Sequence, residues 1–162
     1  MASGKTTTAH LLAKASGLRY IDLDEVLEQE SGKTISELFE EVGEVKFRKM
    51  EHEALNSIVN RSESFVLSLG GGTPCYANNH LVMEREDVVS VYLKVSIPEL
   101  GRRIRRQDGK RPLVKKLGDE ELDEFIAKHL FERSYFYHKA KHVLSADGKT
   151  PEDMVNEIMS LY

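Results

Sequence analysis

The chain has 162 residues, of which 40% are hydrophobic and 31% charged, and its formal net charge is −4 at pH 7. That length suits one domain with a single core, and the acidic balance argues against general nucleic-acid binding, which favours basic surfaces. Its longest apolar runs fall short of the roughly 20 residues that a membrane-spanning helix needs. The single cysteine, Cys75, cannot form an internal disulfide or build a zinc site alone. A cytoplasmic protein that binds neither nucleic acid nor membrane is therefore expected.

The first residues match the second half of the phosphate-binding loop pattern G-x-x-x-x-G-K-[ST], with Ala2, Ser3, Gly4, Lys5 and Thr6. In such a loop, backbone N–H groups and the N-terminus of the following helix bind a polyphosphate. The lysine reaches the β- and γ-phosphates, and the hydroxyl after it holds Mg²⁺. A short Ser-Gly-Lys-Thr run is also compatible with an ordinary polar loop, so the rest of the chain has to decide between the two.

The beginning of this pattern lies outside the sequence. Its first glycine would stand two residues before Met1, and the strand that normally leads into the loop would lie further upstream. In a right-handed α/β layer such a strand is central and buried on both faces. We therefore expect the first central strand to be missing from this sequence, and we expect a 162-residue chain without it to be poorly stable and nearly inactive.

Helical and strand patterns alternate along the chain. Apolar periodicity and capping residues predict the helices, and short apolar runs predict the strands. Helices are expected at 5–15, 25–30, 34–41, 44–60, 96–106, 119–140 and 151–161, and strands at 19–23, 64–69, 88–95 and 141–145. This alternation indicates an α/β fold with a parallel sheet. The polar stretch 107–118 has no clear period and is predicted to be a lid, with a plain surface loop as the alternative.

Two acids, Asp22 and Asp24, stand at the end of the first predicted strand. Ligands of open α/β sheets bind at the carboxyl ends of strands, and residues i and i+2 of a strand share a face. We therefore expect both carboxylates to converge on a metal ion or a hydroxyl group. The alternative for Asp24 is a helix N-cap, because a predicted helix follows it.

Three glycines, Gly70 to Gly72, follow the second predicted strand, where a backbone without side chains can approach a ligand closely. Their alternative is a flexible turn. Arg48 and Arg133 lie on predicted helices and Arg111 in the polar stretch; each is also compatible with an ordinary surface role. The histidines show no metal-binding spacing and are expected on the surface.

In this order and spacing, the chain resembles the shikimate kinase family. The motifs that carry the resemblance are Ser3-Gly4-Lys5-Thr6-Thr7, Ile21-Asp22-Leu23-Asp24, Gly43-Glu44-x-x-Phe47-Arg48-x-x-Glu51, Leu67-Ser68-Leu69-Gly70-Gly71-Gly72, Arg111-Pro112-Leu113 and Arg133-x-x-x-Tyr137. The third motif, together with the three glycines, separates this family from adenylate-type and gluconate-type kinases, which share only the loop. One departure is Tyr135, which stands where the family usually has proline.

The resemblance implies a P-loop NTPase-like three-layer sandwich, with a parallel sheet flanked by helices. It implies one kinase domain over residues 1–162, with a substrate-binding helical segment at 24–60 and a lid at 107–118. The implied reaction transfers the γ-phosphoryl group of ATP to the 3-hydroxyl of shikimate in the aromatic amino acid pathway, with Mg²⁺ as cofactor and a monomer as the working form. Two alternatives are another small-molecule kinase of this fold with an anionic substrate, and a truncated, non-catalytic binding remnant.

The resemblance also implies a role for each candidate. Asp24 would hold the shikimate hydroxyls and orient or deprotonate the attacking one, and Arg48 and Arg133 would clamp the shikimate carboxylate. The implied catalytic residues are Lys5, Asp24 and Arg111; the implied substrate-binding residues are Asp24, Arg48, Gly70, Gly71, Gly72 and Arg133. The nucleotide-binding residues would be Ser3, Gly4, Lys5, Thr6, Thr7 and Arg111, and the metal-binding residues Thr6 and, through water, Asp22.

Overall fold

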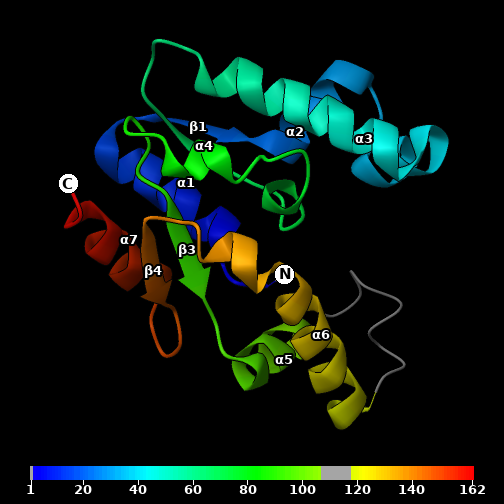
Figure 1. The fold of residues 1–162 in the computed structure, drawn as a ribbon. Coiled ribbons are helices and arrows are strands. Elements are labelled where there is room, and N and C mark those ends of the chain that lie inside the picture. The colour runs from blue at the N-terminus through cyan, green and yellow to red at the C-terminus, as the bar shows by residue number, and fades with distance from the viewer. Residues whose placement is uncertain (1, 107–117) are drawn as a thin grey trace.

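The structure, a computed structural model, describes residues 2–106 and 118–162 (Figure 1). Its elements in chain order are α1 (Lys5–Ser16), β1 (Arg19–Asp22), α2 (Leu23–Ser31), α3 (Ile35–Val59), β2 (Phe65–Ser68), the 3₁₀ helix η1 (Thr73–Cys75), α4 (Leu81–Glu84), β3 (Val91–Lys94), α5 (Ile97–Arg106), α6 (Asp119–Tyr137), β4 (His142–Ser145) and α7 (Pro151–Met159). The predicted helices and strands of the described part are confirmed, with shorter strands than expected, whereas η1 and α4 were not anticipated.

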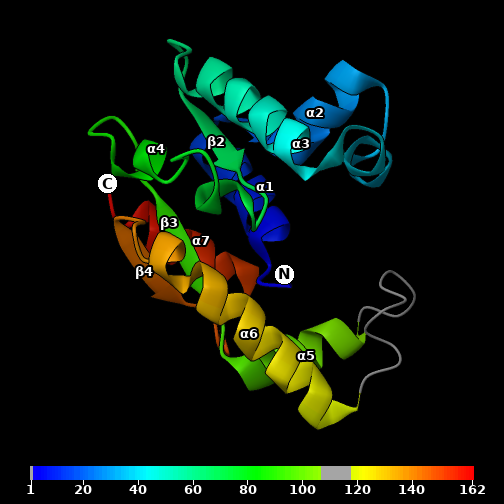
Figure 2. The ribbon, with the colours of Figure 1, turned by 45° about the vertical axis from the view of Figure 1, so that its right-hand side comes forward.

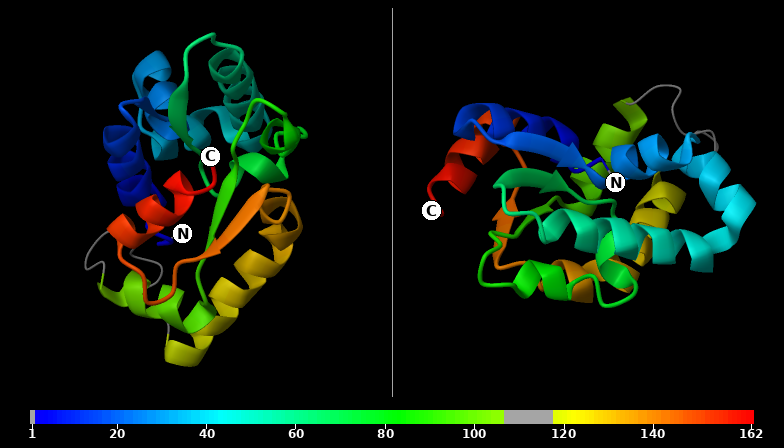
Figure 3. Two further views of the ribbon diagram at one scale, coloured as in Figure 1. Left: turned by 90° about the vertical axis from the view of Figure 1, so that its left-hand side faces the viewer. Right: turned by 90° about the horizontal axis from the view of Figure 1, so that it is seen from above.

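The strands form parallel pairs flanked by helices, as the alternating pattern predicts (Figure 3). In one pair β1 runs beside β2, and Asp22 lies opposite Ser68. In the other, β3 runs beside β4, and Val91 lies opposite His142. Within residues 2–106 and 118–162, β2 pairs only with β1 and β3 only with β4. The strand expected ahead of the phosphate loop stays a prediction.

The first helix owes its bounds to two glycines. Gly4 precedes α1 at φ 87°, and Gly17 follows it at φ 68°, both in the left-handed region that glycine adopts without a steric penalty. The helix packs against β1 and β2 and lies alongside α7 (Figure 3). The strands therefore fix the direction in which the N-terminus of α1 points.

Helix α3 bends at Gly43, which has φ 74° and ψ 166°. This bend accounts for the two separate helices, 34–41 and 44–60, that the sequence pattern predicts. The predicted capping box opens the helix: Glu37 N–H donates to Thr34 Oγ1, and the Glu37 carboxylate accepts from Thr34 N–H.

Two apolar clusters form the core at opposite ends of the view in Figure 2. One joins β1, α2 and α3 around the fully buried Leu23, Leu55 and Ile58. The other joins α5, α6 and α7 around Leu122 and Ile126. Of the helices described, none is long and apolar enough to cross a membrane.

Candidate active site

The carboxyl ends of β1 and β2 position the first group of predicted site residues. Because the two strands are parallel, Asp22 and Ser68 end at the same edge of their sheet. Lys5, the first residue of α1, reaches this edge: its Nζ donates a 2.5 Å hydrogen bond to Ser68 Oγ and lies 3.9 Å from Asp22 Oδ2. The structure thus brings the lysine of the phosphate-binding pattern to the predicted acids.

The rest of the phosphate-binding pattern lies at the start of α1. Gly4 is the N-cap residue, and the backbone N–H of Thr8 donates to its carbonyl at 3.0 Å. The side chains of Thr6 and Thr7 are exposed in the first turn, and Ser3 lies just before it. A hydroxyl at Thr6 is therefore accessible to a ligand that binds at the N-terminus of this helix.

The expectation that Asp22 and Asp24 share a strand face is wrong. Strand β1 ends at Asp22, whose Oδ1 accepts a 2.9 Å hydrogen bond from Asp24 N–H and so caps α2. The alternative prediction for Asp24 is also wrong, because the N-cap is Asp22 and Asp24 lies in the first turn of the helix. A capping aspartate ends the strand at Asp22, one residue earlier than the predicted range 19–23.

Asp24 nevertheless faces the glycine turn. A Cβ atom on Gly70 would lie 3.1 Å from Thr73 Oγ1 and 3.2 Å from Asp24 Oδ1, so the carboxylate packs closely against the glycine. Burial raises the pKa of Asp24, and the charge of Asp22 adds to this, while Lys5 opposes it. Asp24 therefore holds its proton more readily than an ordinary aspartate.

Arg48 lies across the same turn. A Cβ atom on Gly72 would lie only 2.7 Å from Arg48 Nη2, so the guanidinium packs directly on the glycine backbone. Its Nη1 donates to Glu51 Oε2 at 2.8 Å, and its guanidinium carbon lies 4.2 Å from the centre of the Tyr76 ring. The buried Nε makes no hydrogen bond and lies 3.8 Å from Glu44 Oε1. Two acids and a tyrosine ring thus fix the Arg48 guanidinium beside the turn.

Gly71, the middle glycine of the turn, is hydrogen-bonded to a side chain of α6. Tyr137 donates a 2.7 Å hydrogen bond to the Gly71 carbonyl, and burial raises the pKa of Tyr137 to about 12, so its hydroxyl stays a donor at neutral pH. Arg133 lies one turn earlier on the same helix, with its Nη1 hydrogen-bonded to His129. The charges of Arg133 and Arg48 both lower the pKa of Cys75, although burial outweighs them and raises it. Both arginines therefore lie near the segment that follows the glycines.

A buried polar network supports this arrangement, and the sequence reasoning assigned it no role. Thr73 Oγ1 donates to Glu51 Oε1 at 2.6 Å, and Asn79 Nδ2 donates to the Thr73 carbonyl at 2.9 Å. His52, which was expected on the surface, is half-buried, and its Nδ1 lies 2.7 Å from Asn79 Oδ1. Thr73, Glu51 and Asn79 are each at most 1% exposed.

The spacing of Glu51, three residues after Arg48 on a helix, is the signal that could have predicted part of this network. Asn79 offers no comparable signal, because only the fold brings it to Thr73. Arg111 and the predicted lid, apart from Gly118, lie outside the described residues.

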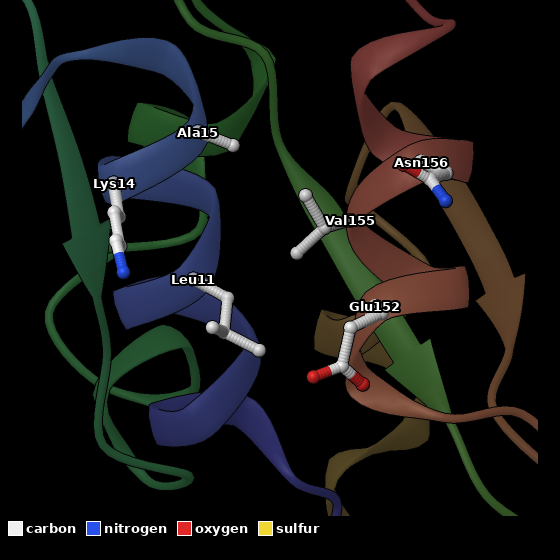
Figure 4. A pocket seen from close by; sticks show the side chains of 6 residues that line it. All are labelled: Leu11, Lys14, Ala15, Glu152, Val155 and Asn156. Atoms are coloured by element: carbon white, nitrogen blue, oxygen red, sulfur yellow. The ribbon is translucent and has the colours of Figure 1, made fainter.

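A cavity of about 350 Å³ lies elsewhere, between α1 and α7 (Figure 4). Its lining residues are Leu11, Lys14, Ala15, Glu152, Val155 and Asn156. The lining includes none of the predicted site residues, and its charged groups are a single lysine and a single glutamate. The cavity therefore has no part in the cluster around Lys5, Asp24 and Arg48.

Comparison with known protein families and sequences gives a consistent result. The family profile described as "Shikimate kinase" matches residues 1–162. A shikimate kinase of Flavobacterium psychrophilum is 50% identical over 158 residues, which are 98% of this chain and 92% of that protein. A shikimate kinase of Flavobacterium johnsoniae is 45% identical over 161 residues, which are 99% of this chain and 94% of that protein.

Comparison with solved structures gives the same result as the comparison with sequences. A crystal structure of shikimate kinase from Bacteroides thetaiotaomicron has a TM-score of 0.87 at 34% sequence identity, covering 99% of this chain and 91% of that one. Shikimate kinase from Acinetobacter baumannii in complex with shikimate has a TM-score of 0.84 at 30% identity, covering 99% of this chain and 87% of that one. The predicted fold class is confirmed by these likenesses.

Proposed function

Since the chain belongs to the shikimate kinase family, we propose that it transfers the γ-phosphoryl group of ATP to the 3-hydroxyl of shikimate at the site built around Lys5, Asp24 and Gly70–Gly72. One observation carries this assignment: the Asp24 carboxylate lies against Gly70, with Lys5 on the β1–β2 edge and Arg48 on Gly72. An acid and an arginine thus lie on one glycine turn, and the lysine of the phosphate-binding pattern lies at the strand end that leads into it.

The N-terminus of α1 would form the part of this site that binds the ATP phosphates. Backbone N–H groups at its N-terminus and the charge of Lys5 suit the polyphosphate of ATP. Phosphoryl transfer needs positioning and charge neutralisation more than covalent chemistry, and Lys5 would provide both at the N-terminus of α1. Ser3, Gly4, Thr6 and Thr7 would complete the nucleotide site, with Arg111 closing over the phosphates from the proposed lid at 107–118.

The donor set at this edge fits Mg²⁺. Thr6 offers an exposed hydroxyl, whereas both oxygens of Asp22 already accept hydrogen bonds, from Asp24 N–H and from Tyr20. Mg²⁺ keeps several of its waters in protein sites, so Thr6 would hold the ion directly and Asp22 through water. When bound, the ion would neutralise charge on the phosphates.

Asp24 is the group that acts on the attacking hydroxyl in this proposal. A carboxylate whose pKa is raised accepts a proton more readily, which suits a general base. Because Asp24 lies against Gly70, it would hold the substrate hydroxyl at the glycine turn, between Lys5 and Arg48. The segment 24–60, which carries both Asp24 and Arg48, would form most of the substrate-binding surface.

The substrate carboxylate would bind Arg48 and Arg133. A guanidinium binds a carboxylate bidentately, and the Arg48 guanidinium lies directly on the glycine turn, where a Cβ atom on Gly72 would meet it. Two positive charges near Cys75 and Tyr76 favour an anionic substrate, which agrees with shikimate. We also propose that the enzyme works as a monomer in the cytoplasm.

We predict that Arg133→Ala weakens shikimate binding roughly tenfold to a hundredfold, because it removes a charge-assisted hydrogen bond of about 1.5–3 kcal/mol. ADP affinity should change less than twofold. Titration calorimetry with each ligand measures both, and Lys128→Ala, an exposed lysine on the same helix, is the control. Equal losses for the two ligands would remove Arg133 from the clamp.

Arg48 needs a different design, because Arg48→Ala would leave the buried Glu51 carboxylate without its cation. Removing one partner of such a pair costs roughly 3–5 kcal/mol of stability. The variant Arg48→Ala with Glu51→Gln avoids that charge and keeps an acceptor for Thr73. We predict that this double variant folds and loses shikimate affinity while it retains ADP affinity.

Gly72→Ala should weaken shikimate binding about tenfold, a loss comparable to one charge-assisted hydrogen bond. Gly72 has φ −87° and ψ −23°, which alanine adopts without strain, so the added methyl group acts only by displacing the Arg48 guanidinium. Melting temperature and shikimate affinity are the two measurements. An unchanged affinity in a normally folded variant contradicts the placement of Arg48 on the turn.

A further inference from the structure

Tyr20 lies on β1 two residues before Asp22 and therefore on the same face of the strand. Its hydroxyl donates a 3.0 Å hydrogen bond to Asp22 Oδ2. Its ring packs on His10 of α1, with ring centres 3.8 Å apart. The hydroxyl is thus fixed between the strand that carries the metal-side acid and the helix that carries Lys5.

Ser68 holds the phosphate-binding lysine beside Asp22. Lys5 Nζ donates to Ser68 Oγ at 2.5 Å, and Ser68 lies opposite Asp22 in the β1–β2 pair. The Lys5, Tyr20, Asp22 and Ser68 side chains therefore form one polar cluster at the carboxyl end of the two strands, in which Tyr20 donates to Asp22 and Lys5 donates to Ser68.

This polar cluster determines which groups bind the Asp22 carboxylate. Asp22 is 8% exposed, and its Oδ1 and Oδ2 accept from Asp24 N–H and Tyr20. With both oxygens satisfied, Lys5 Nζ stays 3.9 Å away instead of forming a close ion pair. If the Tyr20 hydroxyl were removed, the Lys5 ammonium could replace it by moving onto Oδ2, because a buried carboxylate oxygen without a partner is costly.

We propose that Tyr20 is a positioning residue: together with Ser68 it keeps the Lys5 ammonium out of a direct ion pair with Asp22, and so leaves it available to nucleotide phosphates. This inference rests on the assignment of Lys5 to those phosphates in the proposed function. It goes beyond that assignment because Tyr20 touches neither substrate and acts only through its hydrogen-bonded neighbours.

The test is titration calorimetry with ADP on the parent, Tyr20→Phe, Lys5→Ala and the double variant, with Mg²⁺ and again without it. We expect Tyr20→Phe to weaken ADP binding about three- to tenfold, the effect of one lost hydrogen bond, under both conditions. In the Lys5→Ala background, Tyr20→Phe should cause no further loss, because the effect passes through Lys5. Shikimate affinity should stay unchanged.

Tyr92→Phe is the matched control, since Tyr92 is the second residue of β3 as Tyr20 is of β1, and it lies outside the polar cluster around Asp22. It should leave ADP affinity unchanged, and the single variants should melt within a few degrees of the parent. Equal losses from Tyr20→Phe with and without Lys5, or a loss confined to the titration with Mg²⁺, would overturn the inference. An unchanged affinity in Lys5→Ala alone would overturn the phosphate assignment, and the inference with it.

Discussion

Asp24→Asn is expected to lower kcat about 10²- to 10⁴-fold, the contribution of a well-placed general base. The amide keeps the shape of the side chain beside Gly70 but cannot accept a proton from the attacking hydroxyl. ADP affinity should hardly change, because the proposed nucleotide contacts come from α1. Steady-state turnover and ADP titration of the purified variant separate the two effects.

The same substitution should not destabilise the fold at pH 7. Burial raises the pKa of Asp24 above its ordinary 3.8, so the folded chain binds this proton more tightly than the unfolded chain does. Stability from the protonated group is therefore present at low pH and is lost as the pH rises through the raised pKa. Asparagine stays neutral throughout, so its melting temperature relative to the parent should be equal or higher at pH 7 and the difference should shrink on acidification.

Glu25→Gln is the matched control for Asp24→Asn, since Glu25 is an exposed acid in the same first turn of α2. It should leave turnover and melting temperature unchanged. A normal turnover for Asp24→Asn, accompanied by a fall in melting temperature, would mean that Asp24 has a structural role and that another group orients the substrate hydroxyl.

Lys5→Ala is expected to reduce turnover by at least 10²- to 10³-fold, the effect of removing one preorganised group that stabilises charge in a transition state. Turnover within threefold of the parent contradicts the assignment. The fold should survive, because Asp22 keeps its hydrogen bonds from Tyr20 and Asp24 N–H. Lys14→Ala, an exposed lysine on the same helix, is the control and should turn over normally.

Local signals in the sequence determined the helices, the glycine turn and the type of chemistry. Gly4 and Gly17 mark the bounds of α1, and Thr34 with Glu37 marks the start of α3. These signals are reliable because each depends on backbone geometry or a hydrogen bond within a few residues. The same holds for the lysine that follows Gly4, because the loop pattern places it at the N-terminus of the helix.

Only the tertiary structure decided how these parts meet. The hydrogen bond from Asp24 N–H to Asp22 ends β1 early and turns Asp24 into α2, which the strand pattern did not predict. The contacts of Asp24 with Gly70 and of Arg48 with Gly72 join residues 46 and 24 positions apart in the chain. Asn79 carries no motif, and its contact with His52 joins residues 27 positions apart, so it depends on the packing of distant segments. Tyr20 carries no motif either, although its partner Asp22 is only two residues away on the same strand face. A hydrogen bond between side chains far apart in sequence leaves no periodic trace, so no pattern of residues could have predicted it.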